Sequence, residues 1–572
     1  MLLFLLAHIL QTCLHESIHA NVSKQFENVQ HKRSIKSTTW ANIRIKFDYR
    51  YMDGTINDGL TCTTVNQIIT WQSKSYACKP ADVLNYSQIR VAKMTMENVR
   101  QYLQKLLKVI PLASPINVQN YDRWTNYRLP YSISNIDLYM AIVSRPYDDL
   151  SYIMATAGSN IYESTFYRPI QGAVFLNPRW IPSSPQNEDS KNNKFFFVIV
   201  HEIFHALGIA ANMFPLYHPY EISTPYSSTF CWLKKSGKVM KFITTPYAHN
   251  FATKQFGTKT FVGDNGTCPS GIEIENTELG SHLPGRVYMT DLMTSINIQT
   301  DAGPFTRLTD ASMALLQDTG NYKVTWTMGQ PLVWGHPESI DGNPIKDFAI
   351  GPPQKTFPSN YQFDFGAHHK SYTGFDYKFY GPSKTGASWN CADLSHLQYQ
   401  NVKDYCAGKL FYNPNNQESI GTNQEFDYIP FFFPNHVCGR GEAVIPNTLN
   451  DLNILSGEYK CNGNSSFTIK IPTNTNGRGK TTVKCDSSNV GMITTGKILT
   501  TDSYIQWKYW CPPPERFCRS VALHEMNFKN NPFLSYTKQL EDVPNPIKPN
   551  RTKLQTATPM VRLKTGVNIP FL

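Results

Sequence analysis

The pattern of apolar and polar residues distinguishes a helix from a strand early in the chain. Between about Gln88 and Ile110, apolar residues recur at helical spacing among lysines and arginines. This pattern predicts an amphipathic helix that packs one face on a sheet. The run from Asp137 to Val143 is instead almost continuously apolar, which predicts a buried strand.

A second helical pattern begins at Phe195 and is apolar on most of its faces. The residues from Phe195 to Val200 are all apolar and include no Pro or Gly, and further apolar residues continue the pattern to Ala211. This length favours a buried helix over a strand. Gly208 interrupts the pattern, and a residue without Cβ suits a sharp turn of the chain there.

His201, Glu202 and His205 form an H-E-x-x-H motif inside this second helical pattern. Histidines with this spacing lie about one turn apart on one helix face, so both imidazoles can bind one Zn²⁺. The intervening glutamate then faces the metal-bound water, as the general base of a zinc hydrolase does. The alternative is a buried helix with two hydrogen-bonded core histidines.

A catalytic zinc ion needs a third protein ligand and an open fourth position. The compact metzincin spacing would place a histidine ten residues after His201, but that residue is Ala211, so the compact pattern is excluded. His282 stands in a more suggestive setting, Gly-Ser-His-Leu-Pro, and is followed by Met293 and by the stretch Leu308–Tyr322. Considered singly, His282 would be interpreted as a surface histidine and Met293 as a core methionine.

Taken in order, these motifs resemble the leishmanolysins and their animal relatives, the invadolysins. That family has H-E-x-x-H-A-L-G, a long insertion, a G-S-H segment, a Met-turn and a helix with the pattern T-M-A-x-x-Q-D-x-G-x-Y. The resemblance implies that His282 is the third ligand and that Met293 is the Met-turn residue beneath the metal. It covers residues 38–335 and fades beyond Trp334.

The resemblance also has implications upstream of the motif. Residues Thr39–Ile45 resemble the first strand of the family's mature enzymes, and Cys62 and Cys78 match its first disulfide. The segment that begins with Gly172, Ala173 and Val174 occupies the place of the edge strand along which zincins bind an extended peptide. On the residues alone, a purely structural strand is equally consistent with this segment.

The implied fold is α+β: a metzincin-like zincin catalytic domain with a twisted sheet and two long helices above a cleft, followed by a disulfide-rich, mainly loop and β C-terminal domain. The chain then divides into a signal peptide (1–12), a propeptide-like segment (13–37), an N-terminal catalytic subdomain with the zinc helix (38–212), a subdomain with the insertion, third ligand and Met-turn (213–335), and a Cys-containing C-terminal domain (336–572).

The C-terminal domain is predicted from composition. It contains seven cysteines from Cys391 to Cys518, aromatic clusters such as Tyr428–Pro434, and many Asn, Gly, Pro and Thr residues. These features favour a disulfide-pinned domain rich in loops and strands. Such a domain is a candidate interaction module for an extracellular-matrix or cell-surface partner.

Composition and charge favour an extracellular protein. The chain has twelve cysteines and N-x-S/T sequons at Asn85, Asn265, Asn464 and Asn550, which indicate the secretory pathway. The net charge of +11 is spread along the chain without a long basic run, so no nucleic-acid partner is predicted. Residues 1–12 resemble a short signal peptide, and neither a transmembrane run nor a GPI signal is seen. A soluble secreted protein is therefore expected.

The cysteines do not all pair within one mature chain. Removal of Cys13 leaves eleven of the twelve, and pairing Cys62 with Cys78 leaves nine, so at least one stays free or pairs between chains. Cys231 and Cys268 lie between the second and third ligands, and one of them is a candidate for a bridge to the C-terminal domain.

The predicted function is zinc-dependent endopeptidase activity on protein and peptide substrates, with one Zn²⁺ per chain. His201, His205 and His282 would hold the metal as neutral imidazoles. Glu202 would take a proton from the bound water and pass it to the leaving amine. The alternatives are a secreted adhesion or binding protein with a structural zinc, and a hydrolase of non-peptide amides. Glu202 argues against the first, because a structural site needs no base.

Cys13 stands in Cys-Leu-His-Glu, which resembles the propeptide segment H-R-C-I-H-D of the leishmanolysins. In that family the thiolate occupies the fourth zinc position of the latent enzyme. Here Gln11-Thr12 replaces His-Arg, so a cysteine switch and a signal-peptide cysteine without a role are both open. The basic pair Lys32-Arg33 is a candidate maturation site.

If Cys13 survives signal cleavage, we expect the secreted form to be latent and to be activated by a mercurial or by proteolysis near Lys32-Arg33. A Cys13→Ser chain should be active without treatment, because a hydroxyl is a far poorer zinc ligand than a thiolate. Activity assays combined with N-terminal sequencing check this. A secreted chain that starts beyond Cys13 before activation, or a latent Cys13→Ser form, would refute the switch.

Overall fold

The computed structural model describes residues 30–31, 39–71, 74–118, 131–147, 153–276, 280–295, 299–300, 303–358, 361, 373–381, 388–391, 419–421, 426–428, 434–449 and 454–525. In its N-terminal part a five-stranded sheet has the order β1 (Gln30–His31), β10 (Ala155–Glu163), β11 (Pro169–Leu176), β9 (Leu138–Ser144) and β3 (Ile45–Asp48). β10 runs antiparallel to β11, and the other neighbours are parallel. Several sheets and few helices make the described chain a mixed α/β protein, in agreement with the α+β expectation.

The interior strand β9 shows how this sheet divides the apolar residues. Its even-numbered residues from Leu138 to Ile142 are buried in the core that includes the helices, whereas the odd-numbered ones from Tyr139 to Val143 belong to a second cluster. Because side chains alternate along a strand, the two sets lie on opposite faces of the sheet. Burial on both faces explains why this strand is almost continuously apolar in the sequence.

The first of two helices on the sheet is α3 (Tyr86–Leu106). It begins at Asn85, whose side chain accepts a hydrogen bond from the backbone N–H of Gln88. This helix confirms the one predicted between Gln88 and Ile110, except that the chain leaves the helix early and forms β6 (Leu107–Val109).

The second helix, α4 (Lys194–Leu207), packs against α3 and against β10 and β11. All but two of its fourteen residues are buried, which accounts for its apolar sequence. The helix ends at Gly208, which has a φ of +131°. The apolar pattern continues to Ala211, but the turn expected at Gly208 is confirmed, because this glycine takes the chain out of the helix.

The first predicted strand is divided between two sheets. Within Thr39–Ile45, the short strand β2 (Ala41–Asn42) pairs with β6, and β3 begins at Ile45 and pairs with β9. These residues do form β-structure, as predicted, but they contribute to two strands instead of one.

The strand that contains Gly172, Ala173 and Val174 lies inside the sheet. β11 is bonded to β10 on one side and to β9 on the other along this stretch. The prediction that it is an edge strand is therefore wrong, since an apolar run shows that a strand is buried but not which strands flank it. The outer strand is β10, and among the described strands its outer side pairs only with β1, at Tyr162 and Glu163.

The middle of the chain adds helices and short strands above α4. These elements are β12 (Phe230–Lys235), β13 (Lys238–Ile243), α5 (Pro246–Phe256), β14 (Thr260–Val262), β15 (Thr267–Pro269), β16 (Ile272–Ile274), α6 (Gly285–Tyr288) and α7 (Asp310–Asp318). At the end of α7, Asp318 accepts hydrogen bonds from Thr245 Oγ1 and from the N–H groups of Tyr247 and Ala248, at 2.6, 3.0 and 2.8 Å. This carboxylate thereby caps α5 and joins the two helices.

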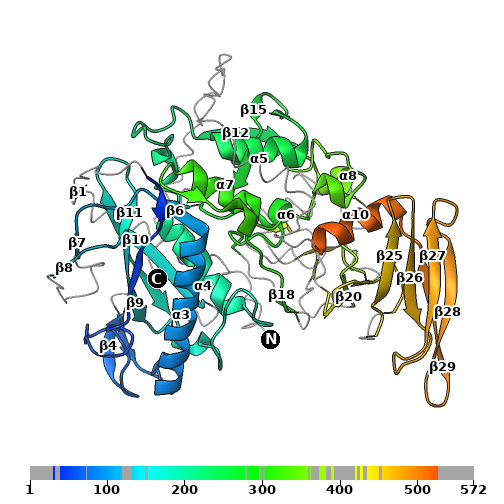
Figure 1. Ribbon diagram of the computed structural model, residues 1–572, viewed down its shortest axis with the longest axis horizontal. Helices are drawn as coiled ribbons and strands as arrows, with labels where there is room; N and C mark the ends of the chain where they lie inside the picture. Colours follow the sequence, from blue (N-terminus) through cyan, green and yellow to red (C-terminus); the bar gives the residue numbers. More distant parts are fainter. Residues whose placement is uncertain are drawn as a thin grey trace.

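The last described part is rich in strands. It contains a sheet of β24 (Glu442–Ala443), β25 (Gly457–Asn462), β26 (Ser466–Pro472) and β27 (Lys480–Asp486), a hairpin of β28 (Ile493–Leu499) and β29 (Tyr504–Trp510), and the helix α10 (Pro514–His524). In Figure 1 these strands lie at one end of the molecule, the sheet with α3 and α4 lies at the other, and α5, α6 and α7 lie between them.

The disulfides confirm one cysteine prediction and correct another. Cys62 pairs with Cys78 as expected. Cys231 and Cys268 pair with each other, so the prediction that one of them reaches the C-terminal domain is wrong: β12 and β15, which carry them, are neighbours. Cys438 is a buried free thiol, in agreement with the odd count.

Further disulfides pin the C-terminal strands. Cys461–Cys518 joins β25 to α10, and Cys485–Cys511 joins β27 to the residue after β29. Cys391 is disulfide-bonded as well. The described residues of this part therefore form strands joined by disulfides, while a separate C-terminal domain stays a prediction.

The remaining described elements are short. They are β4 (Ile68–Trp71), β5 (Lys74–Ala77), β7 (Ile116–Val118), β8 (Tyr131–Ile133), β17 (Gln299–Thr300), β18 (Gly303–Pro304), β19 (Lys323–Val324), α8 (Pro353–Thr356), β20 (Phe379–Tyr380), β21 (Ser388–Asn390), β22 (Ser419–Gly421) and β23 (His436–Val437). Among the described helices, none has both the length and the apolar character needed to cross a bilayer. The predicted signal peptide, Cys13 and Lys32-Arg33 lie outside the described residues.

Gly172→Ala is expected to destabilise the fold. A Cβ at Gly172 would lie 2.3 Å from the carbonyl oxygen of Gly158 and 3.0 Å from Met140 Sδ, so the two strands would have to separate. We expect a loss of about 2 kcal/mol, measured by thermal or urea unfolding. Gly266→Ala is the control, because its Cβ would meet nothing within 4 Å. An unchanged midpoint in Gly172→Ala would contradict this packing role.

Candidate metal centre

The helix α4 brings two of the predicted ligands to one face. His201 and His205 are both buried, and their Nε2 atoms lie 3.0 Å apart. This proximity follows from the spacing of the motif, which returns the second side chain to the same side of the helix after about one turn. Helix geometry alone therefore builds two thirds of the ligand set.

The third predicted ligand reaches the same point from a distant segment. His282 precedes α6, and its Nε2 lies 3.2 Å from that of His205. One nitrogen from each of the three buried histidines lies within 4.8 Å of the others, and this is the only such group of possible ligands in the described part of the chain. The structure thus brings together all three histidines named from the sequence.

Each imidazole is oriented through its other nitrogen. His201 Nδ1 lies 2.7 Å from the carbonyl oxygen of Leu292, and His205 Nδ1 lies 2.7 Å from that of Ile209. His282 Nδ1 lies 3.2 Å from Glu275 Oε2. Because these partners are acceptors, each Nδ1 carries the proton and each Nε2 presents its lone pair to the centre.

Burial keeps the site in the protonation state that a metal requires. Desolvation, together with the neighbouring His282, lowers the pKa of His201 to about 3, although the Leu292 carbonyl and Glu275 act in the opposite direction. The imidazole is therefore neutral at neutral pH and can bind a metal.

The ligand geometry fits a zinc ion. Tetrahedral Zn²⁺ with Zn–N bonds of about 2.0–2.1 Å separates its ligand nitrogens by roughly 3.3 Å. The observed separations of 3.0 and 3.2 Å between Nε2 atoms are close to this value. Three neutral imidazoles of this kind also match the ligand set of catalytic zinc sites.

Glu202 lies between α4 and the sheet. It is 2% exposed, and its Oε2 accepts a hydrogen bond of 3.1 Å from the backbone N–H of Ala157 in β10. The carboxylate of this residue, which follows His201 on α4, is thus held against β10. Ala157 was not identified from the sequence, because no motif relates it to a helix 45 residues away.

Met293 lies in a turn that is tied to two of the ligands. The Leu292 carbonyl accepts from His201, and the Met293 carbonyl accepts a hydrogen bond of 2.9 Å from the backbone N–H of Leu283, next to His282. The Met293 side chain is fully buried. The turn therefore positions the first and third histidines through its backbone.

A buried carboxylate shapes this turn. Asp291 accepts hydrogen bonds from the backbone N–H of Met293, at 2.7 Å, and from the hydroxyls of Thr309 and Ser312. Burial raises the pKa of Asp291 to about 6, against these hydrogen bonds, which lower it. The turn is thereby anchored to the start of α7, the helix that follows it in the sequence pattern.

Two other residues important for the site were missed from the sequence. Glu275 orients His282, and Ile209 orients His205, but neither stands in a recognisable motif. The usual presence of a carboxylate or carbonyl behind a ligating histidine could have suggested that such partners exist, but not which residues provide them.

Comparisons with known proteins agree with this centre. The leishmanolysin family model matches residues 10–342, which is more than half of the chain. The chain is similar to a leishmanolysin-like peptidase of Drosophila melanogaster, with 25% identity over 203 residues covering 30% of this chain and 28% of that protein. It is also similar to a ciliated left-right organizer metallopeptidase of Danio rerio, with 24% identity over 148 residues covering 25% and 22%. The chain thus spans less than a third of the length of either relative.

His282→Ala should lower zinc affinity and peptidase activity together, because two imidazoles leave the coordination incomplete. Zinc content after dialysis, measured by atomic absorption, and cleavage of casein check this. His249→Ala is the control, since that histidine contacts the Ser270 carbonyl instead of the three-histidine cluster. Unchanged zinc content in His282→Ala would mean that the third ligand is another residue.

Proposed function

The chain belongs to the leishmanolysin family of metallopeptidases, and from this premise we propose that it is a secreted zinc-dependent endopeptidase. The observation that carries the proposal is the convergence of three neutral, buried imidazoles beside the buried carboxylate of Glu202. The disulfides and the sequons support an extracellular location.

The role of each residue in the site follows from the chemistry of its side chain. His201, His205 and His282 would hold zinc, which when bound acidifies a water molecule and polarises the scissile carbonyl. Glu202 accepts the proton of the attacking water and returns it to the leaving amine. The hydrogen bond from the backbone N–H of Ala157 to Oε2 orients this carboxylate.

We place the substrate along β10, in place of the β11 segment expected from the sequence. Glu202 contacts the backbone of β10 at Ala157, so an extended peptide on the outer side of this strand passes next to the general base. The remaining side of β10 is already bonded to β11. Addition of a strand to a sheet edge would hold the substrate by its backbone, which suits a peptidase that acts on varied sequences.

The retained base weighs against a purely structural zinc. A zinc-containing adhesion or binding protein would need the three histidines but not a glutamate held at the centre. In this chain Glu202 is buried and hydrogen-bonded beside the ligands, although a buried carboxylate is costly to maintain. A role as the catalytic base would explain why a buried carboxylate is present at this position.

Glu202→Ala is expected to keep about one zinc per chain and to lose peptidase activity by roughly 10²–10⁴-fold, because it removes the base and leaves the ligands. Zinc content and casein or gelatin cleavage, with and without a chelator, check this. Asp82→Asn is the matched control: Asp82 is equally buried and bonds to Tyr76 and Arg179, so its loss should lower stability but not remove turnover. Full activity in Glu202→Ala would favour a non-catalytic function.

A further inference from the structure

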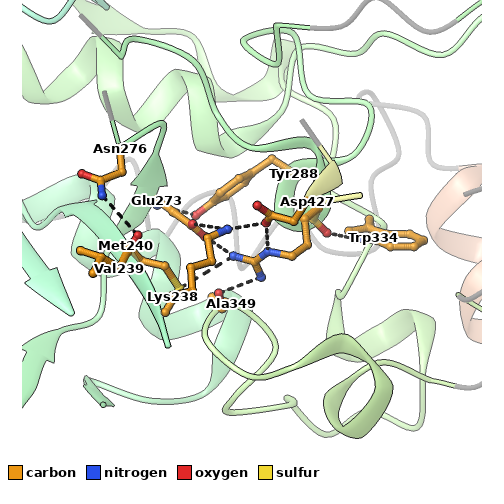
Figure 2. A network of polar contacts seen from close by, with 10 residues as sticks. Lys238, Val239, Met240, Glu273, Asn276, Tyr288, Trp334, Ala349 and Asp427 are labelled. Carbon is orange, nitrogen blue, oxygen red and sulfur yellow. Dashed lines mark hydrogen bonds and ion pairs between the residues drawn. The ribbon is translucent and has the colours of Figure 1, made fainter. Parts of the chain in front are cut away.

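A cluster of four charged side chains, two of them buried and two partly buried, includes a residue four positions after the third histidine. The guanidinium of Arg286 is fully buried; its Nη2 lies 2.5 Å from Glu273 Oε2, and its Nε lies 2.9 Å from Asp427 Oδ2. Lys238 Nζ also pairs with Asp427 and lies 3.6 Å from Glu273 Oε1. In Figure 2 the side chains of Lys238, Glu273 and Asp427 point toward one another. Two positive and two negative charges thus balance within the cluster.

Arg286 fixes the helix that follows the ligand. It lies in α6, four residues after His282. Its Nη1 donates to the carbonyl oxygen of Ala349 at 3.0 Å, and its own carbonyl accepts from Trp334 Nε1 at 2.8 Å. The first turn after His282 is therefore held by both side-chain and backbone contacts.

Glu273 fixes the strand that precedes the ligand. It lies in β16, two residues before Glu275. Glu275 contacts His282 twice: its carboxylate accepts from Nδ1, and its backbone N–H donates to the His282 carbonyl at 3.0 Å. The Arg286–Glu273 ion pair thus joins the two chain segments on either side of the ligand.

Asp427 belongs to a third segment, far away in the sequence. The ring of Phe426 packs so closely against Gly285 that a Cβ there would lie 2.6 Å from it. Asp427 and Tyr428 have φ values of +50° and +57°, a conformation that costs energy for a tyrosine and persists only where the surroundings determine it. The segment 426–428 therefore fits the start of α6 in both shape and charge.

We propose that Asp427 is a positioning residue for the third metal ligand. It completes the charge balance of Arg286 and Lys238, keeps α6 and β16 together, and thereby holds His282 and Glu275 in register with His201 and His205. Asp427 lies beyond residue 342, where the family match ends. The inference is that the metal centre depends on a part of the chain outside the matched region, and it rests on the proposed zinc site.

The test is zinc affinity of the full-length Asp427→Asn protein, measured by competition with a chromophoric chelator. Asn has nearly the same size and tolerates a positive φ, so the substitution removes the charge and little else. We expect about tenfold weaker zinc binding, in the range typical for residues behind a metal ligand. The visible spectrum of the Co²⁺-substituted protein should change as well, because His282 is displaced.

The matched control is Asp58→Asn. Asp58 forms a fully buried ion pair with Arg145, which lies near Phe175 in the cluster on the face of the sheet opposite α4. We expect this variant to lower the unfolding temperature but to keep the zinc affinity and the Co²⁺ spectrum of the wild type. This control separates the general effect of losing a buried ion pair from the specific effect of displacing the ligand His282.

A milder variant covers the case in which Asp427→Asn does not fold. Lys238 is 16% exposed at its side chain, so Lys238→Gln should fold and weaken zinc binding about threefold through the same cluster. Wild-type affinity and spectrum in whichever variants fold would overturn the positioning role. A wild-type chain that binds no zinc would instead overturn the proposed function.

Discussion

The hydrogen bonds to the three Nδ1 atoms are the constraint on which the metal centre depends. Each acceptor comes from a different place: Ile209 follows α4, Glu275 follows β16, and Leu292 lies in the Met293 turn. An imidazole can ligate only if its ring is held in one orientation and one tautomer. The helix, the strand and the turn must therefore pack together before the three Nε2 atoms converge, and the centre is a property of the whole N-terminal and middle fold.

The local part of the site could be predicted from the sequence, because it depends on helix periodicity. The spacing of His201 and His205 fixes their common face without any knowledge of the neighbours. His282 is 77 residues from His205, and it was identified through resemblance to a family. In the structure its Nε2 lies close to those of the other two histidines.

The features that could not be predicted from the sequence are those that depend on which elements are neighbours in the fold. Resemblance to the family suggested that the segment from Gly172 is an edge strand, but β11 lies inside the sheet because it pairs with both β9 and β10. Likewise, the eleven cysteines left after removal of Cys13 predicted one that is free or pairs between chains, whereas the Cys231–Cys268 pairing depends on the proximity of β12 and β15. Glu275, Ala157 and Asp427 belong to the same class, because their roles come from tertiary contacts.

Electrostatics explains why carboxylates surround a centre whose ligands are neutral. Burial holds the pKa of His201 far below its usual value, to about 3, so an unliganded site loses stability as the pH falls from about 6.5 toward that value. Neutral ligands, however, leave the double charge of a bound zinc ion uncompensated in a buried place. Glu202 and Glu275 lie at the centre and directly behind His282, and their two carboxylates can balance that charge. On the proposed function, Glu202 acts as the base and Glu275 orients His282, and both carboxylates also provide counter-charges to the metal.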